Sequence, residues 1–174
     1  MVWWGNYGRN SSRGDMMDEA EWAINEFGAA LLGDSRRTDR LIEVAIALGQ
    51  RPGASIPTAC DDVAMRKGAY RLCESAAVVP AAILASHIQA TWERVAAVPV
   101  TLAVRDTTEL DFTGYLATDG LGPLRHRREW GLLTHSTLAV TPEGLPLGLL
   151  AQEVWARPRA LERNGRGAEQ APPG

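Results

Sequence analysis

The chain of 174 residues contains one lysine, two cysteines and no long hydrophobic run. Cys60 and Cys73 form no CxxC pair, and two isolated thiols fit a reducing cytoplasm better than a disulfide framework. The opening segment MVWWGNYGRNSSRGD (1–15) has no long apolar core, so we expect neither a signal peptide nor a membrane span there. The apolar runs elsewhere are too short to cross a bilayer. These absences predict a cytoplasmic protein without a membrane partner.

Positive charge comes almost entirely from arginine, with 17 arginines beside Lys67. The formal net charge of −3 argues against a nonspecific polycation, so any nucleic-acid contact must come from a local patch. Residues 36–71 supply such a patch, because they contain seven basic and four acidic residues. Hydrophobic content of 45% and charged content of 22% are normal for a globular protein.

Helical periodicity dominates the first half of the chain. Residues 1–14 are rich in Gly, Asn, Ser and Arg and are predicted to be disordered. A helix is predicted from about Asp15, with an apolar stripe of Ala20, Ile24, Phe27 and Leu31. A second helix is predicted over 33–50, capped by Asp34 or Ser35. Residues 58–75 are predicted to form two helical pieces hinged at Gly68, the first capped by Thr58. A longer helix is predicted over 80–97. Residues 51–57 are predicted to be a loop, and Tyr70 to pack in the core.

After Pro99 the hydrophobic period changes from 3.6 to 2, which indicates strands. The first strand is predicted over 100–106, and a hairpin over 131–155, where two apolar runs flank the turn sequence TPEG. Residues 113–129 form an insertion between them, and 159–174 are predicted to be a disordered tail. Leu147, Leu149 and Val154 are expected to form an exposed apolar edge. Helices followed by three strands predict an α+β fold.

The stretch VTLAVRDTTELDFTG (100–114) runs from a hydrophobic strand into three acids, Asp106, Glu109 and Asp111. Asp106 has the parity of Val100 and Val104, so it would continue their inward-facing row. A carboxylate held at the end of a buried strand suits a metal ligand. The alternative is a capped turn over 106–108, because Asp and Thr side chains bond nearby backbone amides. The pattern alone favours the turn.

Five blocks, in the same order and at similar spacing, resemble the front of a bacterial cut-and-paste transposase of the transposon-five type. This type lies within the insertion-sequence transposases that have an RNase H-like catalytic core. The blocks are EWAINEFGAALLGDSRRTDRL (21–41), MRKGAYRLCES (65–75), AVRDTTELDF (103–112), EWGLLTHSTLAV (129–140) and GLLAQEVWARP (148–158). Together the resemblance covers about residues 20–158.

The resemblance implies an all-helical DNA-binding module over 15–75, which grips the inverted-repeat ends of a transposable element. It also implies that 76–158 begin an RNase H-like α/β core with its first three strands. Asp106 would be the first acid of a DDE triad and a ligand of Mg²⁺. Two basic clusters are predicted to contact DNA: Arg36, Arg37 and Arg40 at a helix start, and Arg66, Lys67 and Arg71.

Other candidate residues receive structural roles or stay open. Glu109 and Asp111 match no triad position and are assigned to the turn. A lone histidine on a strand is usually structural, so His135 is left out of the catalytic set. The basic run at 125–128 is either another backbone-contacting patch or an exposed loop, and the sequence does not decide between them.

The family's second Asp and its Glu have no counterpart in this sequence, and the segment after Pro158 departs from the family pattern. We therefore expect a truncated transposase that binds transposon ends without cleaving them, with full-length transposase or a second copy as a further partner. Such a protein would be cytoplasmic and nucleoid-associated. The alternatives are a non-enzymatic regulator that prefers a promoter, and a non-functional remnant of an insertion element.

Overall fold

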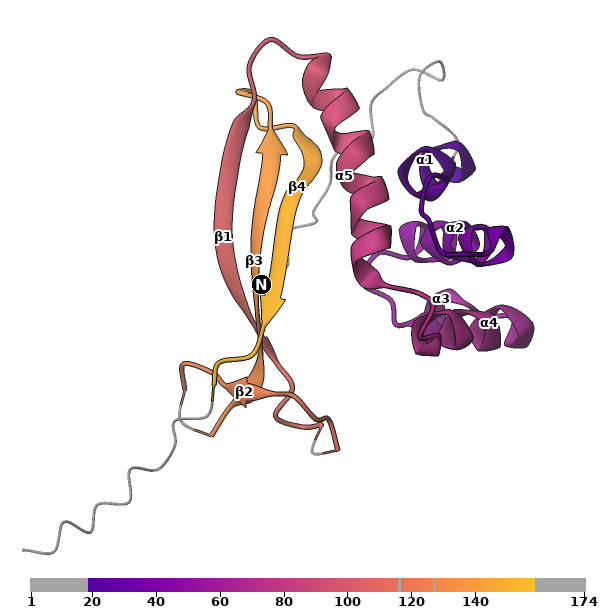
Figure 1. Ribbon diagram of the computed structural model, residues 1–174, viewed down its shortest axis with the longest axis vertical. Helices are drawn as coiled ribbons and strands as arrows, with labels where there is room; N and C mark the ends of the chain where they lie inside the picture. The colour runs from indigo at the N-terminus through magenta and orange to yellow at the C-terminus, as the bar shows by residue number, and fades with distance from the viewer. Residues whose placement is uncertain (1–18, 116, 127, 159–174) are drawn as a thin grey trace, which may run out of the picture. The chain divides into compact units, whose positions relative to one another are not determined.

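The computed structural model describes residues 19–115, 117–126 and 128–158, and within them helices precede strands (Figure 1). The helices are α1 (Glu19–Phe27), α2 (Ser35–Gln50), α3 (Ile56–Ala59), α4 (Val63–Glu74) and α5 (Pro80–Ala96). The strands are β1 (Leu102–Asp111), β2 (Gly122–Pro123), β3 (Trp130–Val140) and β4 (Pro146–Trp155). The α+β prediction is confirmed. The segments predicted to be disordered, 1–14 and 159–174, lie outside the described residues.

Aspartate caps begin α2 and α4. Asp34 is the cap of α2, and its Oδ1 accepts a hydrogen bond from the amide of Arg36 at 3.0 Å. Asp62 caps α4 by accepting from the amide of Met65 at 2.8 Å.

The prediction of a Thr58 cap and a hinge at Gly68 is wrong. The break falls at 60–62, α3 begins inside the predicted loop, and α4 runs through Gly68.

The predicted apolar stripe of the first helix is partly wrong. Ala20 and Phe27 are half-buried, and Phe27 packs against the core. Ile24 is 53% exposed and Leu31 is 88% exposed, whereas Ala23 and Glu26 are buried. The helix ends at Phe27, so the residues after it no longer follow the helical period. Ala30 and Leu32 enter the core instead, packing with Leu41 of α2 and Leu72 of α4 (residues of one buried cluster).

The described chain divides into two units. The first unit contains residues 19–102 and 139–149, which are the five helices and the turn end of the β3–β4 hairpin; the second contains 103–138 and 150–158. In the first unit α1 packs against α2 and α5, and α2 packs against α3 and α4 (Figure 1). A second buried cluster joins these helices: Val44, Ala47, Cys60 and Ala69.

β3 is the strand with which the other three pair. β2 runs antiparallel to it, with Gly122 opposite Gly131. It is a fourth strand, lying inside the predicted insertion at 113–129. β1 continues through Asp111 instead of ending at Asp106, so a turn over 106–108 is not formed. Asp111 does serve a turn, because its Oδ1 accepts from the amide of Thr113 at 2.8 Å.

The predicted β3–β4 hairpin is confirmed, and its turn spans 141–145. The predicted apolar edge is partly wrong. Leu147 is 8% exposed, and its carbonyl accepts a 2.6 Å hydrogen bond from Nε of Arg94 on α5. Leu149 is half-buried, and only Val154 is exposed, at 55%. The hairpin end is therefore docked on α5 within the first unit.

Gly148 permits this docking. Its φ is +136°, and a Cβ there would overlap Oγ1 of Thr91 and lie 2.9 Å from Nη2 of Arg94. We expect Gly148→Ala to lower the free energy of unfolding by about 3 kcal/mol, since overpacking adds to backbone strain. Urea denaturation measures this loss.

Gly144 provides the matched control, because it also has a positive φ, +91°, but nothing lies within 4 Å of its would-be Cβ. Gly144→Ala should cost only about 1–2 kcal/mol, the strain of a left-handed conformation alone. Equal losses at the two glycines would contradict the tight docking at Gly148.

Candidate nucleic-acid interface

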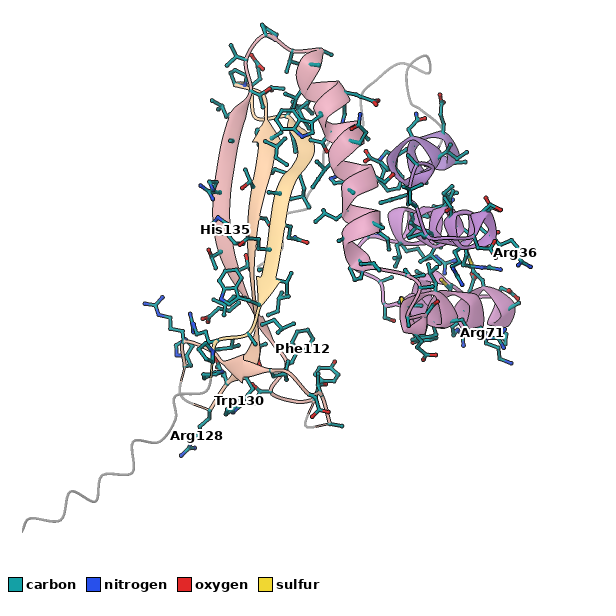
Figure 2. The ribbon with its side chains drawn as sticks, viewed as in Figure 1. Arg36, Arg71, Phe112, Arg128, Trp130 and His135 are labelled. Carbon is teal, nitrogen blue, oxygen red and sulfur yellow. The ribbon has the colours of Figure 1, made fainter. Side chains whose placement is uncertain are left out.

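The start of α2 carries the first predicted basic cluster. Arg36 is 86% exposed in its side chain, and its guanidinium binds the carboxylate of Asp34 at 2.9 and 3.3 Å. The hydrogen bond from the Arg36 side chain, with that from its amide, lowers the pKa of Asp34. Arg36 is thus accessible to a ligand, with its charge partly balanced by Asp34 (Figure 2).

The other two members of this cluster hold the fold together. Arg37 donates from Nη1 to the carbonyl of Leu32 at 2.8 Å. Arg40 forms a 2.6 Å ion pair with Glu43. The Arg40 guanidinium lies against α4 at Gly68, where a Cβ would stand 2.8 Å from its Nε. Gly68 therefore leaves room for an arginine between α2 and α4.

Arg66, in the second predicted cluster, also binds the protein. Its Nε donates to the carbonyl of Cys60 and its Nη2 to that of Asp61, both at 3.2 Å. Arg51 acts on the same segment, donating to the Thr58 carbonyl at 2.6 Å and pairing with Asp61 at 2.8 Å. These two arginines stabilise the segment that links α3 to α4.

Lys67, Tyr70 and Arg71 form the outer face of α4. Their spacing of three and four residues places them on one side of the helix, and all three are exposed. No side-chain hydrogen bond or ion pair joins them to any residue within 19–115, 117–126 or 128–158. Tyr70 is 42% exposed, so the prediction that it packs in the core is wrong. The opposite side of α4 buries Ala69 and Leu72.

The outer face of α4 thus offers two unpaired cations and an aromatic hydroxyl together. Val63 begins this side of the helix and Glu74 ends it, both exposed. Arg71 is exposed on α4, as Arg36 is at the start of α2, and Figure 2 labels both residues. Sequence reasoning named Lys67 and Arg71 but missed Tyr70. The sequence did carry a signal. Ala69 and Leu72 mark the apolar side of the helix, and the helical period places Tyr70 on the other side.

Residues 19–78 match the family model described as Transposase DNA-binding. The match covers α1 to α4 and supports a transposase N-terminus with a DNA-binding function. Both predicted basic clusters fall within the matched residues. In the described ranges, the structure contains no helix long and apolar enough to span a membrane.

Asp106 lies in β1, in the second unit, and is exposed. The predicted inward-facing row is wrong, because Val100 and Val104 are 53% and 50% exposed. The Asp106 Oδ2 accepts a 3.2 Å hydrogen bond from the Thr108 hydroxyl. No three His, Cys, Asp or Glu side chains within the described residues are grouped so as to hold a metal ion. The described donors around Asp106 therefore do not fit Mg²⁺, which needs several oxygen ligands.

His135 and Glu109, also in the second unit, have protein partners. His135 Nδ1 lies 2.7 Å from the hydroxyl of Thr107 on the neighbouring strand (Figure 2). Glu109 stays within β1 instead of joining the turn, and it accepts from the Arg125 amide at 3.1 Å and pairs with Arg157 at 3.0 Å. The side chains of Arg125 and Arg128 are exposed.

Proposed function

We propose that this chain binds the inverted-repeat ends of a transposable element of the transposon-five type, as double-stranded DNA. The transposase DNA-binding domain carries the activity, and the outer face of α4 is the observation that supports the site. A helix fits the major groove of DNA, where lysine and arginine contact phosphates or guanine edges. Tyr70, between the two cations, adds a hydroxyl for phosphate or base contact.

The six predicted basic residues divide by what they already bind. Lys67 and Arg71 are free to contact DNA, and Arg36 can add a contact from the start of α2. Arg37, Arg40 and Arg66 act mainly inside the domain, since their guanidinium groups are engaged by carbonyls or carboxylates. We assign the free cations the larger share of binding.

Fluorescence anisotropy with three labelled duplexes tests this proposal. The duplexes are an inverted repeat flanking the gene, a shuffled version of it, and a neighbouring promoter. We expect the inverted repeat to bind at least about tenfold more tightly than the other two at physiological salt. Preference for the promoter would instead identify a regulator, and equal binding to all three would overturn specific recognition.

We further propose that residues after the domain begin an RNase H-like core, with Asp106 as the first acid of a DDE triad. By itself this chain should not cleave DNA, because two-metal phosphoryl transfer needs several carboxylates converging on the ions. A supercoiled plasmid carrying both repeat ends should remain intact with Mg²⁺ or Mn²⁺. An intact transposase of the same element is the positive control, and metal-dependent nicking by the purified chain would refute this expectation.

A further inference from the structure

Glu26 is an acid buried within the first unit, outside the proposed DNA-binding face. Its side chain is 4% exposed and joins α1 to α5. Oε1 pairs with Nη1 of Arg94 at 2.6 Å, and Oε2 lies 2.7 Å from Nδ1 of His87. The backbone carbonyl of Glu26 also accepts a 2.8 Å hydrogen bond from the hydroxyl of Ser86.

The second ring nitrogen of His87 faces β4. Its Nε2 lies 3.0 Å from the backbone nitrogen of Leu149. A backbone N–H can only donate, so Nε2 must offer its lone pair. The ring hydrogen then resides on Nδ1, where it is donated to Glu26. One neutral tautomer of His87 therefore bridges α1 and β4.

The charges around this ring come from two helices. α1 contributes Glu26 and α5 contributes Arg94, whereas the contact from β4 is the Leu149 amide. Burial opposes ionisation of Glu26, but the hydrogen bonds and charges of His87 and Arg94 outweigh it and lower the pKa of Glu26. Glu26 thus remains a carboxylate at neutral pH, ready to hold a charged ring.

We propose that His87 is a proton-operated latch between α5 and the hairpin end of β4. Imidazole is the side chain whose charge ordinarily changes between pH 5 and 8. A proton from solvent that binds Nε2 turns this acceptor into a donor facing the N–H of Leu149, and their hydrogen bond is lost. The hydrogen on Nδ1 is still donated to Glu26, and the positive charge of the ring strengthens the attraction between His87 and the Glu26 carboxylate. Acidification thus releases β4 at Leu149 while α1 and α5 stay joined.

NMR on the ¹⁵N-labelled full chain tests the latch. At pH 8 we expect the hydrogen of His87 on Nδ1, read from the ring nitrogen shifts. Between pH 8 and pH 5, protection of the Leu149 amide from hydrogen exchange should fall about tenfold after correction for intrinsic rates, which corresponds to one hydrogen bond. Amides within α1 should keep their protection. A hydrogen on Nε2 at pH 8, or Leu149 protection that stays constant while the ring titrates, would overturn the proposal.

Two variants separate the roles of the ring nitrogens. In His87→Gln the terminal amide reaches the position of Nε2, so Leu149 should stay protected at both pH values. In His87→Asn the shorter amide replaces only Nδ1, so Leu149 should be unprotected at both. Persistent pH dependence in His87→Gln would assign the switch to another group and refute the latch. The wild-type measurements decide the question even if either variant fails to fold.

Discussion

Replacing Lys67 and Arg71 together by glutamine is expected to weaken binding to the inverted-repeat duplex by at least about tenfold, without loss of folding. Both side chains are exposed and pair with nothing in the described structure, so their removal costs no internal contact. Each lost phosphate contact reduces the dependence of binding on salt. In anisotropy titrations at several salt concentrations, the slope of log K against log salt should become shallower by about 2.

Arg40→Gln with Arg66→Gln is the matched control, because it removes the same number of positive charges from the same domain. These arginines bind Glu43 and the carbonyls of 60 and 61. The control should lower the free energy of unfolding, measured by urea denaturation, and leave the salt slope near that of the wild type. If instead the control flattened the slope and Lys67 and Arg71 did not, the DNA-binding face would lie on the cluster at the α2–α4 contact.

Local side-chain chemistry made much of the fold predictable. The Asp34 cap, Pro80 and the sequence TPEG act on their immediate neighbours, so the sequence alone located the start of α2, α5 and the hairpin. Gly68 was misinterpreted as a hinge because the reason for glycine there is tertiary. The space that it leaves is filled by Arg40, from another helix.

The candidate site was predictable as a set of charges but not as a surface. A sequence shows that an arginine is present but not whether a carbonyl already binds it, so Arg37 and Lys67 could not be separated before the structure was known. The alternation of β1 was correctly recognised, but its period does not say which face is covered. Nothing in the sequence indicated that Glu26 is buried and paired, because its partners His87 and Arg94 lie more than sixty residues away in the chain.

Glu26→Ala is expected to lower the free energy of unfolding by about 3 kcal/mol, because breaking a buried ion pair leaves its partners unpaired. Urea denaturation at neutral pH measures this loss. Glu21→Ala is the control, since Glu21 lies on the same helix but is exposed, and surface changes usually stay within about 0.5 kcal/mol. Similar losses for the two variants would contradict a stabilising role for the buried acid.

The difference in unfolding free energy between the wild type and Glu26→Ala should depend on pH, and this dependence identifies the electrostatic part of the stabilisation. Because the pKa of Glu26 is lowered in the folded chain, its ionisation stabilises the fold above the pKa of an unfolded glutamate, about 4.3. This contribution is lost as pH falls through the lower folded pKa. The gap between wild type and Glu26→Ala should therefore shrink as the pH falls below about 4. A gap that stayed constant would mean that Glu26 stabilises the α1–α5 contact by packing, not by its charge.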